Sequence, residues 1–193
     1  MEIILATNNK YKYEEISKIL PQFIKLLSLN DIKYFDKIDE PYNTIEDNAL
    51  HKARVLYHLT GKNIIADDTA LEIEALNGAP GVFSARFAGE NCSYQDNIDK
   101  VLTLLKDVKK RKATFRTIIA LIINGKEYIF EGKIEGHITE KPRGENGFGY
   151  DPIFQPDGYT KTFAEMSLDE KNKISHRYKA IQKLIDFLNN IIK

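Results

Sequence analysis

The spacing of apolar residues along the chain alternates between the two periods that are typical of an α/β protein. Short apolar runs at residues 2–6 and 23–29 predict buried strands, and residues 64–66 predict another. Helical spacing predicts four helices, one that ends near Leu20 and others at about 45–60, 94–106 and 178–192. The last helix carries its apolar side on Ile181, Leu184, Ile185, Leu188 and Ile192.

A β-hairpin signal lies between the third and fourth of these helices. Strand-like segments at 113–123 and 126–132 flank Asn124-Gly125, a pair that fits a type I′ turn, and a further strand is expected at about 133–139. Because βα units occur together with a hairpin, the sheet should be mixed. We expect an α/β fold with a long mixed central sheet, flanking helices and a single domain over residues 1–193.

Composition narrows the class of protein. The 193 residues are 42% hydrophobic, and 28 basic residues balance 28 acidic ones, so no net field would draw the protein to nucleic acid or to a membrane. The lone Cys92 excludes an internal disulfide and makes a cysteine-based metal site unfavourable. No apolar run is long enough to span a bilayer and no signal-peptide pattern opens the chain, so a cytoplasmic location is expected.

A polar turn follows the first strand and opens the first helix. An arrangement of this kind points backbone N–H groups at an anion, and its lysines add charge, although it lacks the glycines of a Walker motif. A plain capped βα turn is the alternative. The residues of this turn are Thr7, Asn8, Asn9, Lys10, Tyr11 and Lys12.

Two adjacent acids, Asp67 and Asp68, come at the expected end of the strand at 64–66. Burying two carboxylates together is costly, so such a pair usually has a bound cation, a neighbouring base or a retained proton. Ligation of Mg²⁺ and activation of water are natural roles for the pair. The alternative is a polar turn in which Asp67 caps the backbone.

The stretch from 147 to 177 combines rigid backbone with polar side chains, as functional loops often do. Gly147 and Gly149 flank Phe148, and Ser167 with Glu170 has the spacing of a capping box. We interpret Phe148 as the face for a flat ligand, with His176 and Arg177 at its polar edge and phosphates toward Lys171. A packed loop with a helix cap is the alternative.

These polar clusters follow strands or open helices, and in an α/β sheet such ends can converge on one cleft. Together they offer carboxylates for a metal, lysines for phosphates, an aromatic face for a base, and His and Arg for its edge. This set of groups suits a nucleoside triphosphate with Mg²⁺.

Six segments occur in this order within residues 3–188: ILATNNKYK, DNALHKA, IIADDTALEIEALNGAPGVFSARFAGE, GFGYDPIF, TFAEMSLDEKN and SHR. Together they resemble the inosine triphosphatase family, the pyrophosphatases of non-canonical purine nucleoside triphosphates. The resemblance implies two lobes around a deep active-site cleft, a homodimer, and Mg²⁺-dependent hydrolysis of ITP, dITP and XTP to the monophosphate and pyrophosphate. Such an enzyme would sanitise the nucleotide pool.

The resemblance also implies a role for single residues. Asp68 matches the proton acceptor and a metal ligand, and Glu40 matches a second metal ligand, where the residues alone indicated only a solvated acidic loop. The matched substrate-binding residues are Thr7, Asn8, Asn9, Lys10, Tyr11, Lys12, Lys52, Thr69, Phe148, Gly149, Tyr150, Asp151, Lys171, His176 and Arg177. Two positions depart from the family, which often has glycine in place of Asn8 and Ala70. If position 70 requires a positive φ, alanine is strained there.

Base selectivity has a physical basis in this reading. Hypoxanthine and xanthine carry an oxygen at position 6, whereas adenine carries an amino group. Donors from His176 or Arg177 would pair with the oxygen and face a second donor in ATP, a mismatch that can reject a substrate by about 10⁴-fold. Guanine also carries the 6-oxygen, so its 2-amino group must be rejected differently, by shape or by an unpaired donor.

Three rival functions remain open at this point. The first is a pyrophosphatase of similar fold that acts on modified pyrimidine nucleotides. The second is a nucleotide-sensing module without turnover, against which the intact carboxylates argue. The third is a nucleic-acid-binding protein that uses the basic run at 109–112, which the zero net charge disfavours.

Overall fold

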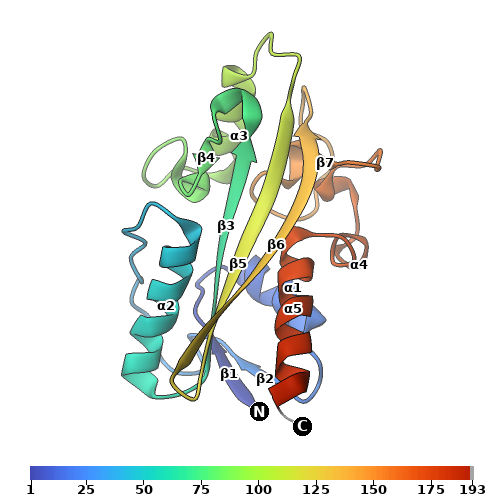
Figure 1. Ribbon diagram of the computed structural model, residues 1–193. Helices are drawn as coiled ribbons and strands as arrows, with labels where there is room; N and C mark the ends of the chain where they lie inside the picture. The colour runs from blue at the N-terminus through green and yellow to red at the C-terminus, as the bar shows by residue number, and fades with distance from the viewer. Residues whose placement is uncertain (192–193) are drawn as a thin grey trace. The chain divides into compact units, whose positions relative to one another are not determined.

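The computed structural model describes residues 1–191, and the chain forms two compact units. Unit 1 comprises Met1–Asp68, Thr117–Gly132 and the chain from His176 onward, and unit 2 comprises Thr69–Arg116 and Lys133–Ser175. Three strands, β3 (Ile64–Ile73), β5 (Lys112–Ile123) and β6 (Lys126–Ile138), pass from one unit into the other (Figure 1). Ile192, expected at the end of the last helix, lies outside the described residues.

Unit 1 has a parallel strand arrangement at one edge of its sheet. Its strand order is β2-β1-β3-β5-β6, and β1 pairs in parallel with both β2 and β3. The elements that belong wholly to it are β1 (Glu2–Leu5), α1 (Lys10–Ile19), β2 (Lys25–Leu27), α2 (Ile45–Thr60) and α5 (His176–Ile191). They confirm the expected strands at 2–6 and 23–29 and the helix near 45–60, within a residue or two at most ends. The last helix, expected at 178–192, is confirmed as far as the described residues extend.

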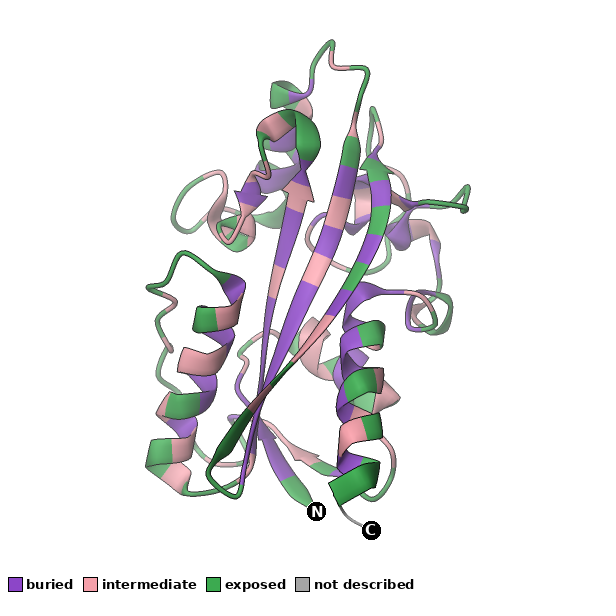
Figure 2. Ribbon diagram, in the orientation of Figure 1, coloured by how far each residue is buried: buried purple, intermediate pink, exposed green. Residues whose placement is uncertain are grey.

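The core of unit 1 follows the two periods of the sequence. Alternate strand residues point to one face and pack against the apolar stripes of α1 and α5. The intervening strand residues face the other way, where α2 lies in Figure 1, and Figure 2 shows the strands as largely buried. The core residues on the side of α1 and α5 include Ile3, Leu5, Ile16, Ile65, Ile119, Leu121, Ala180, Ile181, Leu184 and Leu188.

Unit 2 closes its sheet with antiparallel strands. The order is β4-β3-β5-β6-β7, and both β4 (Pro80–Gly81) and β7 (Phe154–Pro156) run antiparallel to their neighbours. Its helices are α3 (Tyr94–Leu104) and α4 (Leu168–Lys171). The core centres on Phe154, whose ring centroid lies 4.6 Å from that of Phe115 and 5.2 Å from that of Phe163. With the parallel pairs of unit 1, these antiparallel pairs confirm the mixed sheet.

Two strand predictions were wrong. β3 does not end at residue 66 but continues through Asp67 and Asp68, because basic side chains of unit 1 compensate both acids within the strand. The expected separate strand at 133–139 is the second half of β6, which passes through Gly132 without a break. A Cβ at Gly132 would lie 2.0 Å from the carbonyl oxygen of His176, so this glycine permits close helix packing and marks no turn.

Several local predictions were confirmed. Asn124 and Gly125 have φ of 51° and 74°, as a type I′ turn requires. Ser167 caps α4 in a capping box with Glu170. Ala70 is a buried β3 residue without positive φ, so alanine is not strained there. Among the described residues, no helix has both the length and the apolar character needed to cross a membrane.

Candidate functional site

The polar turn after β1 forms a tightly capped helix start. The Asn9 side chain accepts hydrogen bonds from the N–H groups of Tyr11 at 3.0 Å and Lys12 at 3.3 Å, and the Thr7 hydroxyl accepts one from Asn9 N–H at 3.1 Å. This is the capped βα turn that the sequence offered as an alternative to an anion cradle. Asn8 and Lys10 are exposed beside it, and neither has a positive φ.

Four charged side chains around Asp67 form a group that we call the Asp67 network. Its members are Lys12, Glu15, Asp67 and Arg177. Lys12 pairs with one carboxylate oxygen of Asp67, and Arg177 Nε donates to the other at 2.8 Å. Arg177 also donates through Nη1 to Glu15 of α1. Two cations face two anions, so the network is neutral although Asp67 is wholly buried and Arg177 is 1% exposed.

The electrostatics of the Asp67 network favour the charged forms. Burial by itself raises the pKa of Asp67, but the charges of Arg177 and Lys12 outweigh it and hold the pKa well below its usual range. Burial likewise lowers the pKa of Arg177, and the carboxylates of Asp67 and Glu15 more than reverse this effect. Removing the side chain of one member would therefore leave a buried charge without its opposite partner.

A second group, the Lys52 cluster, consists of Lys52, Glu40 and Asp68. Lys52 projects from α2, and its Nζ lies 2.5 Å from Glu40 Oε1 and 3.3 Å from Asp68 Oδ1. It also donates to the backbone oxygen of Asp67 at 2.8 Å. Two carboxylates share one ammonium group, so the cluster carries an excess negative charge when both acids are ionised.

Asp68 is less well compensated than its neighbour. Burial raises the pKa of Asp68; Lys52 and Lys12 oppose this rise, and the negative charges of Glu40 and Asp67 add to it. Burial lowers the pKa of Lys52, yet Asp68 and Glu40 raise it above its usual value overall. An additional cation would therefore be favoured beside these carboxylates.

The donor chemistry of the Lys52 cluster fits Mg²⁺. This ion prefers oxygen ligands and is commonly held by one or two carboxylates together with water and substrate phosphates. Glu40 and Asp68 supply such oxygens, and their convergence on Lys52 Nζ shows that both already face one positive charge. Among the described residues, no three His, Cys, Asp or Glu side chains gather in a complete metal cage. Two carboxylates suffice for this mode of Mg²⁺ binding.

Unit 2 brings together three of the predicted site residues. Asp151 and Lys171 form a buried ion pair of 2.5 Å, and the same Asp151 oxygen accepts a hydrogen bond from Phe148 N–H at 2.9 Å. Lys171 Nζ lies 4.9 Å from the centroid of the Phe148 ring. Gly147 has φ of 74°, and a Cβ there would lie 2.0 Å from the Asp151 carboxylate. Asp151 thus fixes both the Phe148 loop and the ammonium group above its ring.

The remaining predicted residues have less direct placements. Tyr150 is a core residue of unit 2, and its hydroxyl donates to Ser84 O at 2.9 Å. His176 is the first residue of α5 and is 2% exposed. Thr69 is half-buried in β3 directly after Asp68, and Gly149 has φ of 61°.

Glu15 was missed by the sequence reasoning. It lies three residues after Lys12 on α1, and side chains at this spacing share a helix face. That spacing was the available signal, but the partner, Arg177, is 162 positions away in the chain. Only the folded sheet brings α1 and α5 together.

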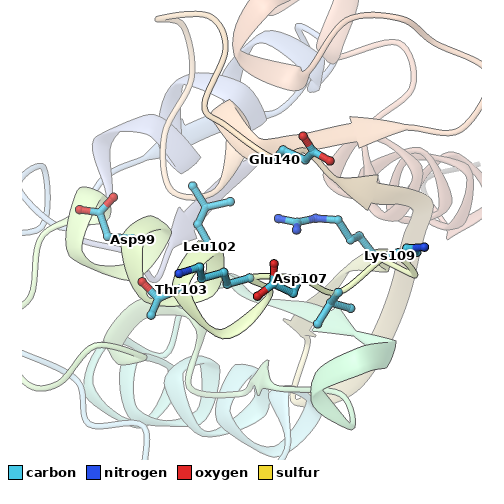
Figure 3. A pocket seen from close by; sticks show the side chains of 9 residues that line it. Asp99, Leu102, Thr103, Asp107, Lys109 and Glu140 are labelled. Carbon is cyan, nitrogen blue, oxygen red and sulfur yellow. The ribbon is translucent and has the colours of Figure 1, made fainter.

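A surface hollow of about 1130 Å³ lies elsewhere in unit 2, beside α3 and the basic run (Figure 3). Arg111 lines it, but its guanidinium donates to the backbone oxygens of Leu105, Ile138 and Thr139 at 2.8, 2.9 and 3.0 Å. It therefore ties the loop to the sheet. The hollow is also lined by Asp99, Leu102, Thr103, Lys106, Asp107, Val108, Lys109 and Glu140. With Arg111 included, three acids and three bases line it. None of the predicted site residues is among them.

The chain is similar to known proteins in both sequence and fold. The chain is 53% identical to the dITP/XTP pyrophosphatase of Flavobacterium psychrophilum, covering 98% of this chain and all of that one. It is 51% identical to the protein of the same name from Flavobacterium johnsoniae, covering 97% and 98% of the two chains. The solved structure of a HAM1 protein from Coxiella burnetii matches with a TM-score of 0.90 at 42% identity, covering 98% and 99%. The Ham1 family model matches residues 3–187, and the chain belongs to the Ham1 family.

Proposed function

We propose that this protein is a nucleoside triphosphate pyrophosphatase that hydrolyses ITP, dITP and XTP to the monophosphate and pyrophosphate. The observation that carries the proposal is the Lys52 cluster, where Glu40 and Asp68 share one ammonium group and leave an excess negative charge in unit 1. The substrate class comes from relatives named dITP/XTP pyrophosphatase that are about half identical over nearly the whole chain. In a cell, this activity would remove deaminated purines from the nucleotide pool.

Mg²⁺ is the proposed cofactor, with Glu40 and Asp68 as its protein ligands. When bound, it would polarise the phosphate oxygens and offset the charge that develops on the leaving group. Lys52 holds the two carboxylates toward each other in its absence, through contacts of 2.5 and 3.3 Å. Its ammonium group would then assist in neutralising the phosphates.

Asp68 is the proposed general base. Its carboxylate accepts a proton from water as the water oxygen forms a bond to the α-phosphorus. The bond between the α-phosphorus and the bridging oxygen breaks, and pyrophosphate leaves with the bonding electrons. The neighbouring Asp67 is held by Lys12 and Arg177, so it is not available for this role. A positioned base of this kind contributes about 10²–10⁴-fold to the rate.

Phe148 is the proposed stacking residue for the purine. The ion pair of Asp151 with Lys171 fixes its loop, and Gly147 leaves room for that pair. The predicted roles of His176 and Arg177 in reading the base edge remain proposals. For Arg177, the bonds to Asp67 and Glu15 support instead a role in orienting the start of α5.

Exposed residues of the turn after β1 are proposed to bind the phosphates of the substrate. Lys10 and Asn8 are the members whose side chains are exposed, while Thr7 and Asn9 shape the turn. Lys12 contributes its charge from within the Asp67 network. A homodimer is proposed as well, and light scattering on the purified protein would establish its mass in solution.

The proposed activity can be tested with a substrate panel. Pyrophosphate release is measured for ITP, dITP, XTP, ATP, GTP, dTTP and dUTP, each with Mg²⁺ and with EDTA. Mg²⁺-dependent release from the first three alone is the expected result. Preferential release from dUTP or dTTP would favour the pyrimidine activity, and binding without product would favour a nucleotide sensor.

A further inference from the structure

Glu40, a proposed metal ligand, lies on an irregular segment of unit 1. In the described part of the chain, no helix or strand is assigned between Leu27, the end of β2, and Ile45, the start of α2. The Glu40 side chain is 27% exposed, yet its carboxylate lies 2.5 Å from Lys52 Nζ. Since a long irregular connection is costly to order, specific contacts must hold its backbone near α2.

Asn48 of α2 supplies such a contact to Tyr42, which lies two residues after Glu40 in the chain. Its Oδ1 accepts a hydrogen bond from Tyr42 N–H at 2.9 Å, and its Nδ2 donates to Tyr42 O at 3.1 Å. Asn48 is 1% exposed, whereas Tyr42 is 44% exposed. A buried side-chain amide therefore hydrogen-bonds both the backbone N–H and the backbone carbonyl of a surface residue. The Tyr42 ring also meets His51 of α2 at 5.4 Å between centroids.

Asn48, which binds the Tyr42 backbone, and Lys52, which pairs with Glu40, lie on one face of α2. Asn48 and Lys52 are four residues apart, so their side chains lie one turn from each other along the helix. Thr44 fixes the start of the helix by accepting a hydrogen bond from Asp47 N–H at 3.1 Å. α2 therefore holds the segment at two points, by its backbone through Asn48 and by its carboxylate through Lys52.

We propose that Asn48 is a positioning residue for the divalent cation, because it fixes the backbone from which Glu40 reaches toward Asp68. The inference rests on the proposed function, in which Glu40 and Asp68 hold Mg²⁺. Asn48 touches neither the cation nor the nucleotide in this role. Residues that orient metal ligands in this indirect way typically change metal affinity by about 10–100-fold when they are removed.

The chain offers a matched control in unit 2. Asn97 stands four residues after the N-cap Ser93 of α3, as Asn48 stands four residues after Thr44 of α2. It is 2% exposed, and its amide accepts from Ala88 N–H at 2.8 Å and donates to Ala85 O at 3.2 Å. Its Oδ1 also accepts from Cys92 Sγ at 3.3 Å. Asn97→Ala therefore removes the same two kinds of backbone bond, and one further contact, from a buried helix residue that is no part of the Lys52 cluster.

The experiment measures the Kd for Mn²⁺ alone, as a stand-in for Mg²⁺, by electron paramagnetic resonance of the free ion. Wild type, Glu40→Gln, Asn48→Ala and Asn97→Ala are compared as full-length proteins without nucleotide. We expect Asn48→Ala to bind about 10-fold more weakly than wild type, and Glu40→Gln to bind at least as weakly. Asn97→Ala should bind as wild type does.

Hydrogen exchange gives a second readout that is independent of metal. Peptides that cover residues 38–44 should exchange faster in Asn48→Ala than in wild type and should be unchanged in Asn97→Ala. If Asn48→Ala does not fold, Asn48→Gln replaces it, since that change keeps the amide but displaces it by one methylene. The same two effects are then expected.

The outcomes separate the two proposals. Weakened binding by Glu40→Gln together with wild-type Mn²⁺ affinity in the Asn48 variant would overturn the positioning role and leave the metal ligands standing. Equal loss of affinity in the Asn48 and Asn97 variants would overturn it too, because general destabilisation would explain both. Undetectable Mn²⁺ binding by wild type, or wild-type binding by Glu40→Gln, would overturn the proposed metal ligands and this inference with them.

Discussion

The two polar clusters of unit 1 start from adjacent residues of β3 yet differ in charge and in partners. Asp67 pairs with Lys12 of α1 and Arg177 of α5, whereas Asp68 shares Lys52 of α2 with Glu40. Successive strand residues point to opposite faces, so one acid meets the helices of one face and the next meets the helix of the other. Two acids that are adjacent in a strand therefore need not share one role.

The difference in compensation divides the roles. In the Asp67 network, each buried charge has an opposite partner, so its proposed role is structural. In the Lys52 cluster, two carboxylates face one ammonium group, so a further cation is favoured there. Substitutions that treat the two acids alike should therefore have unlike effects.

The largest expected effect is on stability, from Asp67→Asn. This change removes a charge that Arg177 and Lys12 need, and loss of one partner from a buried ion pair costs about 3 kcal/mol or more. For a domain of this size, that corresponds to a fall in Tm of roughly 6–12 °C. Thermal unfolding measures it, with the exposed Glu127→Gln as a control that should shift Tm far less. A Tm within error of wild type would contradict a structural role for Asp67.

Asp68→Asn should act on turnover instead. The amide cannot accept the proton of water, so kcat for dITP should fall by at least roughly 10², or about 2.7 kcal/mol in the barrier. Binding of dITP should weaken far less than turnover, because Glu40 and Lys52 remain in place. Tm should not fall, because burial already disfavours the Asp68 charge. Steady-state kinetics with calorimetric binding of dITP tests this, and near-normal kcat would remove Asp68 from the role of base.

Lys52→Met should make stability depend on metal. Without the ammonium group, Glu40 and Asp68 lose a charged hydrogen-bond partner, at a cost of about 2 kcal/mol in EDTA. A bound cation can replace that charge, so Mg²⁺ should raise the Tm of this variant by more than it raises the Tm of wild type. Thermal unfolding with and without Mg²⁺ provides the comparison. Equal Mg²⁺ shifts in the two proteins would argue against a metal beside these carboxylates.

The smallest effect is expected for Arg54→Gln, on the same helix as Lys52. Arg54 pairs with Glu127 at 2.6 Å, but the two side chains are 48% and 37% exposed. Exposed ion pairs contribute about 0.2–1 kcal/mol, so both Tm and kcat should stay close to wild type. A fall in Tm as large as that of Lys52→Met would mean that burial does not explain the difference in stability expected between Arg54 and Lys52.

Much of the fold could be predicted from local patterns. The helix at 45–60 and the turn at Asn124-Gly125 follow from caps, apolar spacing and turn chemistry that act within a few residues. The end of β3 and the continuity of β6 could not be predicted in this way. Asp67 remains in a strand because residues of α1 and α5 neutralise its charge. Gly132 lies within β6 because α5 packs too closely there for any side chain.

The candidate site shows the same division. Resemblance indicated Glu40, Lys52 and Asp68, and the structure brings these three side chains together. Pairings between distant residues, such as Arg177 with Glu15, depend on the folded sheet and leave no local signal. The buried amide of Asn48 has a signal in its spacing from Lys52, but its partner is a backbone group, which no side-chain pattern reveals.

The most direct test follows the oxygen of the attacking water. Hydrolysis of dITP with Mg²⁺ in water labelled with heavy oxygen is analysed by phosphorus NMR and mass spectrometry. Attack at the α-phosphorus predicts pyrophosphate and dIMP as products, with the label in dIMP. Label in pyrophosphate, or orthophosphate and dIDP as products, would contradict the proposed reaction at Asp68.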